Sequence, residues 1–328
     1  MFYKNTSKYE RGVDMAVRGK SINLFLMDGD PSGRIKCTLA NWTGVAFKIP
    51  RTEIDRCKDR DDLKQSGVYF LFGTSDETGK GVVYIGQAGI RKNGEGILNR
   101  LLEHKRNSDK DYWTEAIVFT TSNNSFGATE ISYLENRFCN LALEAKRYEI
   151  KNGNDPTSGH ITEEKESEME EFIDYAKVIM GTLGHKLFEP IGKPPTKAQT
   201  VSPENSDAEI VSLHLKRTIK NIGRDVTANG AQTVEGFVVF QGGDISPVDD
   251  DTIPTAIKER RKTAMIDKKI DTVDKNYILN EDMLFTSPSY AAMFVIGKSA
   301  NGLTSWRTSD GKTLKSLEAN QNITDTFL

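Results

Sequence analysis

Two short apolar segments joined by a polar turn constrain the fold more than any other feature of this sequence. They are "GVYFLFG" at residues 67–73 and "GVVYIG" at residues 81–86, and the intervening "TSDETGK" is rich in turn-forming residues. This pattern predicts a β-hairpin. Side chains alternate between the two faces of a strand, so Tyr69 and Tyr84 each lie opposite their apolar neighbours. Both phenols can therefore emerge on the same side of the hairpin.

The elements around this hairpin predict an α+β fold. Residues 22–49 alternate apolar and polar side chains around the turn cluster "DGDPSG", which favours a small antiparallel sheet. Helical spacing predicts helices at about 94–106 and 128–149, with a strand at 115–121 between them. The order strand, strand, helix, strand, helix favours a small antiparallel sheet flanked by helices.

The length of 328 residues favours about two domains. We predict a β-rich N-terminal extension at 1–60 and the α+β domain at 61–158. An acidic helix and a Pro-, Ser- and Lys-containing linker follow at 159–208, and a separate small α+β domain occupies 209–328. The acidic run of the helix is interpreted as a solvated face, with a site for a basic partner as the alternative.

Composition narrows the class of protein. No apolar run approaches the roughly 20 residues of a membrane span, and the N-terminal residues lack the apolar core of a signal peptide, so a cytoplasmic protein without a membrane partner is expected. The three cysteines, Cys37, Cys57 and Cys139, are far apart and are interpreted as buried free thiols. The net charge of −3 gives no global basic field, so any contact with nucleic acid requires local positive charge.

One carboxylate lies inside an apolar helical stripe. In the helix at 128–149, Ile131, Leu134, Phe138 and Leu141 define this stripe, and Glu135 falls within it. A carboxylate at such a position must be paired, bind a metal, or lie at the rim of the core, because an unpaired buried charge costs several kcal/mol. An ion pair with a nearby arginine is the structural alternative to a functional role.

The helix at 94–106 carries a second polar pair. Arg100 and His104 are four residues apart and therefore share a face, although many helices carry such residues on their solvated side. The hairpin could bring its phenols close to Arg100, His104 and Glu135. The set would then offer a proton acceptor, a guanidinium for phosphate charge and a carboxylate for one divalent metal. Hydrolysis of a phosphodiester requires these groups.

The segment from 67 to about 155 resembles the GIY-YIG nuclease domain. "GVY" at 67–69 stands for the first motif of that family, with Val in place of Ile, and "YIG" at 84–86 matches the second motif. Arg100, His104 and Glu135 follow in the order of the family's arginine, its partner four residues later and its metal-binding glutamate. The family's downstream asparagine corresponds to Asn152 or Asn154, and the sequence leaves that choice open.

The resemblance implies metal-dependent hydrolysis of nucleic-acid phosphodiesters, usually DNA, with RNA left open. It implies one Mg²⁺ or Mn²⁺ per active site, held by Glu135, and a proton acceptor at Tyr69 or Tyr84 assisted by His104. Arg100 would stabilise the developing charge. A homodimer or sequential nicking would serve double-strand cleavage. A catalytically inactive nucleic-acid-binding protein on the same fold and an interaction scaffold are the alternatives.

The C-terminal part carries one clear helix signal and one ambiguous surface. Ser287 before Pro288 is typical of an N-cap, and Gly297 is typical of a helix end. The segment "SPSYAAMFVIGKSANGLTSW" resembles a small domain of unknown function that recurs behind GIY-YIG domains. Trp306 with the basic cluster at 260–262 and Arg307 could form a nucleic-acid contact surface, or Trp306 could belong to the core and the charges to a solvated face.

Overall fold

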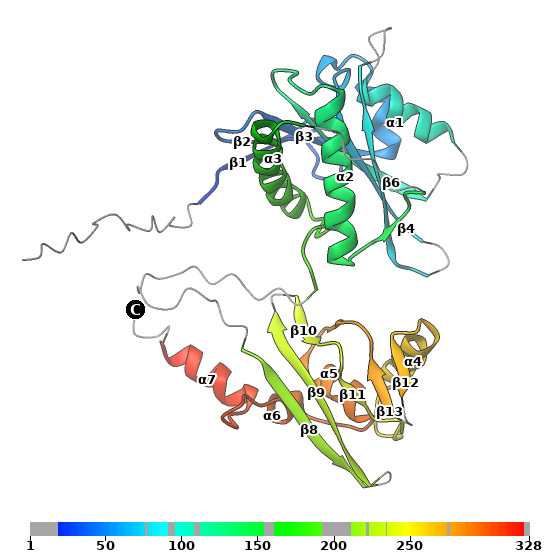
Figure 1. The fold of residues 1–328 in the computed structure, drawn as a ribbon, viewed down its shortest axis with the longest axis vertical. Helices are drawn as coiled ribbons and strands as arrows, with labels where there is room; N and C mark the ends of the chain where they lie inside the picture. Colours follow the sequence, from blue (N-terminus) through cyan, green and yellow to red (C-terminus); the bar gives the residue numbers. More distant parts are fainter. Residues whose placement is uncertain are drawn as a thin grey trace, which may run out of the picture. The chain divides into compact units, whose positions relative to one another are not determined.

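The computed structural model describes residues 19–75, 78–90, 96–107, 112–153, 161–191, 211–220, 223–233, 235–273 and 276–324, with no side chains after 319. The chain divides into two units. The N-terminal unit comprises residues 1–140 with 148–185, and the C-terminal unit comprises residues 141–147 with 186–328. Each unit has its own sheet and helices, and the architecture is mixed α+β (Figure 1).

A seven-stranded sheet forms the N-terminal unit, in the spatial order β1-β2-β3-β6-β4-β5-β7. Its strands are β1 (Ile22–Leu26), β2 (Ile35–Leu39), β3 (Gly44–Pro50), β4 (Gly67–Thr74), β5 (Gly81–Ala88), β6 (Trp113–Thr121) and β7 (Glu149–Ile150). All neighbours pair antiparallel except β5 and β7, which are parallel. The strands of the N-terminal extension therefore continue the sheet of the segment that follows, through the pairing of β3 with β6.

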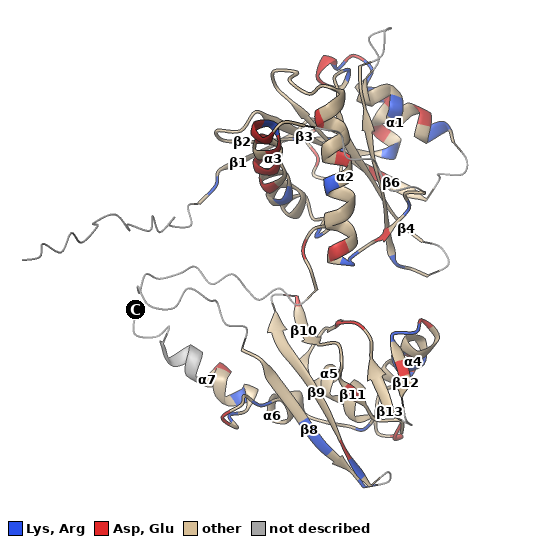
Figure 2. Ribbon diagram, viewed as in Figure 1, with Lys and Arg blue, Asp and Glu red and all other residues tan. Residues whose placement is uncertain are grey.

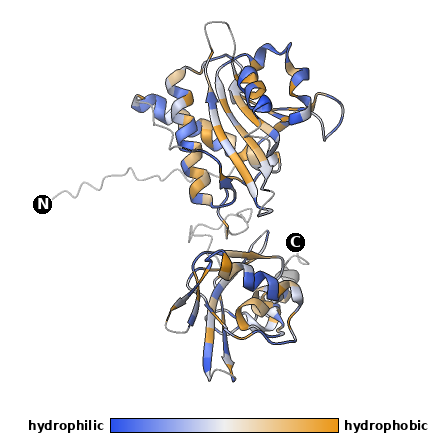
Figure 3. Cartoon of the chain, turned by 90° about the vertical axis from the view of Figure 1, so that its right-hand side faces the viewer, coloured by the Kyte–Doolittle hydropathy of each residue, from blue (hydrophilic) through white to orange (hydrophobic). Residues whose placement is uncertain are grey.

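Helices cover both faces of the sheet around strand β4. They are α1 (Ile97–Arg106), α2 (Ala128–Ala145) and α3 (Glu163–Thr182), and the short 3-10 helices η1 (Arg51–Cys57) and η2 (Asp61–Leu63) precede β4. Leu71 belongs to a buried cluster with Leu101 of α1, whereas the ring of Phe70 lies 5.2 Å from that of Phe138 in α2. Burial on both faces explains the nearly continuous apolar sequence of β4, which Figure 3 shows as part of a predominantly hydrophobic sheet.

The acidic helix α3 packs beside α2 (Figure 1). On its apolar side the ring of Phe172 lies 4.9 Å, centre to centre, from that of Trp42, and its glutamates are marked red along the ribbon in Figure 2. Across the helix pair, Arg137 of α2 binds Glu170 at 2.5 Å, and the Tyr133 hydroxyl donates to the same carboxylate at 2.7 Å. The solvated face expected from the sequence is thus present, and Glu170 also joins two helices.

Replacing Glu170 by glutamine is expected to weaken the fold at neutral pH and not in acid. The Arg137 guanidinium lowers the pKa of Glu170, so the carboxylate stabilises the folded state above the ordinary glutamate pKa. That contribution is lost as pH falls through the lowered pKa. The pair is partly exposed, so a loss of about 1 kcal/mol or less is expected. Urea unfolding at pH 7 and pH 3 measures it, and Glu171→Gln, on the exposed face, is the matched control.

The C-terminal unit contains two smaller sheets. The order β14-β10-β9-β8 forms one and β11-β13-β12 forms the other. The strands are β8 (Leu213–Ile219), β9 (Arg224–Thr233), β10 (Gly236–Val239), β11 (Asp244–Ile245), β12 (Ile270–Val273), β13 (Asn276–Leu279) and β14 (Met283–Phe285). The helices are α4 (Thr255–Ile266), α5 (Pro288–Ile296), α6 (Gly302–Ser305) and α7 (Leu314–Thr324).

Helix α5 forms the centre of this unit, and both of its predicted ends are confirmed. The Ser287 hydroxyl accepts the amide of Tyr290 at 3.2 Å, and Gly297 ends the helix in the left-handed region with φ of 69°. Ala291, Ala292 and Phe294 are buried, because the helix is covered on several sides. The three cysteines are free and buried, as predicted.

Of the two alternatives for Trp306, the structure confirms the core. Trp306 is fully buried, its ring packs 4.5 Å from that of Phe237, and its indole donates to the carbonyl of Pro288 at 3.0 Å. Arg261 is also buried and bonded to main-chain carbonyls, and the guanidinium of Arg260 stacks 4.4 Å from the ring centre of Phe285. Trp306 and Arg261 thus belong to the core, Arg260 is partly buried, and Lys262 and Arg307 are exposed.

Candidate functional site

The hairpin of β4 and β5 brings the two predicted tyrosines to one face. Tyr69 pairs with Gly86 across the strands, and Tyr84 pairs with Leu71. Residues opposite each other in an antiparallel pair lie on the same face, so both phenols point to the side that α1 covers. The ring centroids of Tyr69 and Tyr84 are 6.2 Å apart. Tyr69 is 1% exposed, whereas Tyr84 is only partly buried.

The glycine that ends "YIG" makes room for the first tyrosine. A Cβ at residue 86 would collide with the hydroxyl and ring of Tyr69. Gly86 is buried, and any larger side chain would have to displace the Tyr69 phenol from its place against α1. The two tripeptide motifs are therefore physically coupled, because the ring of Tyr69 in the first motif occupies the space that a side chain at Gly86 in the second motif would need.

A Gly86→Ala substitution is expected to disturb both the fold and the site. One methyl group added to a tightly packed site typically costs about 1–3 kcal/mol, and here it must push the Tyr69 ring away from its neighbours. Thermal unfolding measures the lost stability. Gly89→Ala is a suitable control, because a Cβ there would meet only the Ile131 side chain at an ordinary 3.6 Å. Equal stability of the two variants would contradict the packing argument.

Helix α1 supplies the histidine. The start of α1 packs closely against the residues before β4. The amide of Ile97 donates to the carbonyl of Gln65 at 3.1 Å, and a Cβ at Gly96 would collide with the preceding loop. This anchor directs His104, which is 4% exposed, onto the hairpin. Nε2 of His104 and the Tyr69 hydroxyl share a hydrogen bond of 2.7 Å. The imidazole lies 5.4 Å and 5.2 Å, centre to centre, from the rings of Tyr69 and Tyr84.

Arg100 lies one turn before His104 on the same helix. Its guanidinium forms an ion pair with Glu103 at 2.7 Å, and this carboxylate raises the pKa of Arg100. About two fifths of the Arg100 side chain is exposed (39%), so part of the guanidinium remains accessible to a solute. Its positive charge also acts on Tyr69, so a cation lies near this phenol.

Burial makes Tyr69 a poor proton acceptor. Removal from water raises the pKa of the Tyr69 phenol well above its usual range, the neighbouring Tyr84 adds to that shift, and the charge of Arg100 offsets it only in part. The phenolate form that a base would need is therefore disfavoured at this position. Tyr69 is better suited to hold the imidazole of His104, while Tyr84 retains access to solvent.

Glu135 of α2 reaches the hairpin from the opposite face of the sheet. Its Oε2 accepts a hydrogen bond of 2.9 Å from the side-chain amide of Gln87, near the end of β5. Burial raises the pKa of Glu135, while the Gln87 bonds and the charge of Arg100 lower it in part. The partner is thus an amide and not the arginine of the structural alternative. The sequence reasoning missed Gln87, whose polar side chain in an otherwise apolar strand face was the available signal.

Asn152 binds the main chain of the "YIG" strand. Its side-chain amide donates to the carbonyl of Ile85 at 2.7 Å and accepts the amide of Ile85 at 3.0 Å. It therefore continues the pairing that β7 makes with the first half of β5. This geometry fits a residue that positions the strand between Tyr84 and Gly86. Asn154, the other candidate, lies outside the described residues.

The protein groups at the site suit a metal ion that takes some of its ligands from water and from the substrate phosphate. No group of three His, Cys, Asp or Glu side chains that could hold a metal occurs among the described residues. Mg²⁺ commonly binds to one or two carboxylates and fills its other positions with water and substrate phosphate. Glu135 provides one such carboxylate, kept in place by Gln87 and near the charge of Arg100. The residues fit an ion of that kind.

Comparisons with known proteins gave a family match in the C-terminal unit. Residues 218–318 match the family described as "Domain of unknown function (DUF4357)", in agreement with the expected domain of unknown function. Neither the curated proteins nor the solved structures that were searched gave a match. In the described part of the chain, no helix has the length and apolar character needed to cross a bilayer. The GIY-YIG resemblance rests on the sequence motifs, and none of these comparisons supports it.

Proposed function

We propose that this protein is a metal-dependent endonuclease that hydrolyses phosphodiester bonds of nucleic acid, with DNA as the expected substrate. The observation that carries the proposal is the hydrogen bond between Tyr69 and His104, which joins the first motif strand to the helix that also bears Arg100. A structural histidine would not require a partly exposed phenol and a guanidinium near it. Glu135 adds the carboxylate that the chemistry needs.

In this proposal the solvent-accessible phenol takes part in proton transfer. Tyr84 accepts the proton of the attacking water as it releases its own phenolic proton to the imidazole of His104, whose ring centre lies 5.2 Å from that of Tyr84. Tyr69 orients His104 through their hydrogen bond and stays protonated. This assignment separates two tyrosines that the motifs alone treat as equivalent.

Glu135 would hold a divalent cation, which when bound supplies positive charge against a phosphate oxygen and the leaving group. Burial raises the pKa of Glu135 and so makes its charge costly without a cation. Gln87 keeps one carboxylate oxygen in place and so fixes the side chain's orientation. Together these two residues form the part of the site that comes from α2 and the end of β5.

Arg100→Ala is expected to slow the chemical step more than it weakens binding. The partly exposed guanidinium can stabilise the negative charge that develops on the phosphoryl group. Loss of one such donor typically costs about 100-fold or more in rate. Single-turnover rates at saturating protein measure the chemical step, and affinity for uncleaved DNA measures binding. An unchanged single-turnover rate with weaker binding would contradict the role. Arg106→Ala, exposed at the end of the same helix, is the control.

The experiment that tests the function uses supercoiled plasmid, linear duplex, single-stranded DNA and RNA, each with Mg²⁺, with Mn²⁺ and with chelator. Metal-dependent cleavage by the wild-type protein would establish the activity, and the preferred substrate would decide between DNA and RNA. Salt-sensitive binding without cleavage would instead assign the chain to the nucleic-acid-binding alternative. Sedimentation with and without DNA would show whether a homodimer forms.

A further inference from the structure

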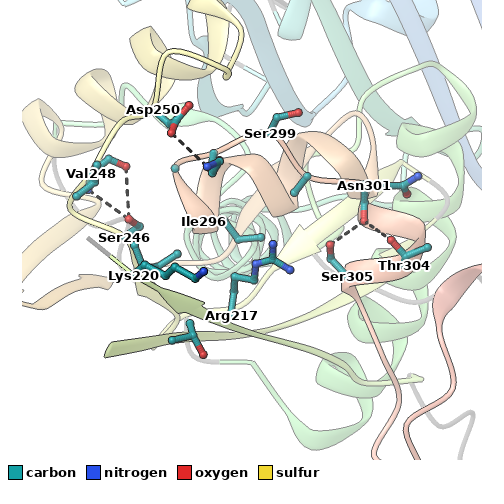
Figure 4. Close-up of a pocket in the computed structure, with 15 residues that line it drawn as sticks. Arg217, Lys220, Ser246, Val248, Asp250, Ile296, Ser299, Asn301, Thr304 and Ser305 are labelled. Atoms are coloured by element: carbon teal, nitrogen blue, oxygen red, sulfur yellow. Dashed lines mark hydrogen bonds and ion pairs between the residues drawn. The ribbon is translucent and has the colours of Figure 1, made fainter. Parts of the chain in front are cut away.

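The C-terminal unit contains a cavity that the proposed chemistry does not use. Its volume is about 540 Å³, within the usual range for ligand sites. Three segments form its wall: residues 217–220 at the end of β8, residues 246–250 after β11, and residues 296–305 at the end of α5 (Figure 4). All three lie inside this unit.

Positive charge predominates around the cavity. Its wall includes three cationic side chains, Arg217, Lys220 and Lys298, and one carboxylate, Asp250. Among the described residues, the side chains of Arg217 and Lys220 have no hydrogen-bond or ion-pair partner, and Lys298 reaches Asp250 only at 3.6 Å. The whole chain has a net charge of −3, so this wall differs in sign from the protein's average.

The three cations are not needed to neutralise the carboxyl end of α5. The carbonyl of Phe294 already accepts from the guanidinium of Arg261, and that of Val295 accepts the amide of Ser246 at 2.8 Å. The carbonyl of Gly297 accepts the amide of Asp250 at 2.8 Å. Most carbonyls at the helix end are therefore satisfied from within the fold, and Arg217 and Lys220 remain available for another group.

The shape of the wall depends on Gly297. Its positive φ turns the chain sharply after α5, and a Cβ there would collide with the carbonyl of Val248. This close approach brings the segment at 246–250 against the segment that carries Lys298 and Ser299. Ser299 adds a hydroxyl group to the wall, and Figure 4 shows it near the Asn301 segment that borders the same hollow.

The described residues that line the cavity include no aromatic side chain. Recognition of an unstacked base depends on aromatic platforms, whereas recognition of the backbone depends on cations and hydroxyl groups. We propose that this cavity binds a phosphate group of the nucleic-acid backbone, without reading sequence, and so anchors the substrate through the C-terminal unit. This inference rests on the proposed function, because it assumes the same nucleic-acid substrate.

The test is the salt dependence of binding to a duplex of about 30 base pairs, with the full-length Glu135→Gln protein to prevent cleavage. Removing one phosphate contact lowers the slope of log K against log salt by about 1. The double variant Arg217→Gln/Lys220→Gln is expected to lower the slope by about 1, because the cavity binds one phosphate group, and each single variant by part of that, equally on two unrelated sequences. Lys216→Gln, which removes a neighbouring charge that already pairs with Asp225 at 3.0 Å, should leave the slope unchanged.

Slopes equal to that of Lys216→Gln in all cavity variants would overturn the phosphate site, and so would the absence of salt-sensitive DNA binding. Calorimetric binding of dAMP that Arg217→Gln removes, with an unchanged duplex slope, would overturn it in favour of a free nucleotide. The two proposals fail separately. A lowered slope without cleavage by the wild-type protein retains the phosphate site and rejects the nuclease, and cleavage with unchanged slopes does the reverse.

Discussion

Glu135→Gln is expected to abolish cleavage while the fold remains intact. The substitution keeps the shape of the side chain and its bond to Gln87 but removes the charge that a divalent cation needs. Loss of several kcal/mol of charge stabilisation corresponds to a rate decrease of at least about 100-fold. Plasmid cleavage by wild type and variant over a range of Mg²⁺ concentrations measures it. Turnover at the wild-type rate would remove Glu135 from the mechanism.

The same variant has an expected signature in stability. Burial raises the pKa of Glu135, so its protonated form is favoured in the folded state. The side chain therefore contributes stability below its ordinary pKa, and that contribution is lost as pH rises through the raised pKa. Without metal, Glu135→Gln should be at least as stable as the wild type at pH 7, and added Mg²⁺ should stabilise only the wild type. Glu144→Gln, exposed on the same helix, is the matched control.

Tyr84→Phe is expected to lower the rate far more than Tyr69→Phe. Tyr84 is the phenol that solvent reaches, and loss of a proton-transfer group typically costs about 100-fold or more. Tyr69 acts through His104, so its hydroxyl is worth about one hydrogen bond, or roughly tenfold. Single-turnover rates from pH 5 to pH 9 compare the two. Tyr69→Phe should also move the pH profile, because His104 loses its 2.7 Å partner.

For stability we expect the opposite order, with a larger loss for Tyr69→Phe than for Tyr84→Phe. The Tyr69 hydroxyl is buried against His104, and its removal leaves a buried ring nitrogen without that partner, at a cost of about 1–3 kcal/mol. Tyr84 is only partly buried, so loss of its hydroxyl should change the unfolding free energy much less. Denaturant unfolding of both variants checks this. A larger rate loss for Tyr69→Phe would assign proton transfer to the buried phenol instead.

Much of the hairpin side of the site could be predicted from local sequence. A two-residue alternation fixes which strand residues share a face, and this was enough to place Tyr69 and Tyr84 together. Helical spacing likewise placed Arg100 and His104 on one helix. Caps are equally local, so Ser287 and Gly297 were identified correctly as the ends of α5. Each of these features depends on residues within a few positions of each other.

Features that depend on distant contacts could not be predicted in this way. The order β3-β6-β4 joins the N-terminal strands to the hairpin sheet, and Asn152 binds Ile85 across 67 positions of the chain. Local patterns also gave no means of telling a buried arginine from a solvated one, so the cluster at 260–262 was assigned a surface role that Arg261 does not have. Burial is decided by which elements pack together, and many packings suit one local pattern.

The sequence by itself determined which groups this protein can present: two phenols, an imidazole, a guanidinium and a carboxylate, on elements whose periodicity sets their faces. Only the tertiary structure decided their environments. It buried Tyr69 against His104, left Tyr84 near solvent and gave Glu135 the amide of Gln87 as its partner. The reason is physical, because the pKa of a group depends on its distance from water and from other charges, and those distances arise only when the chain folds.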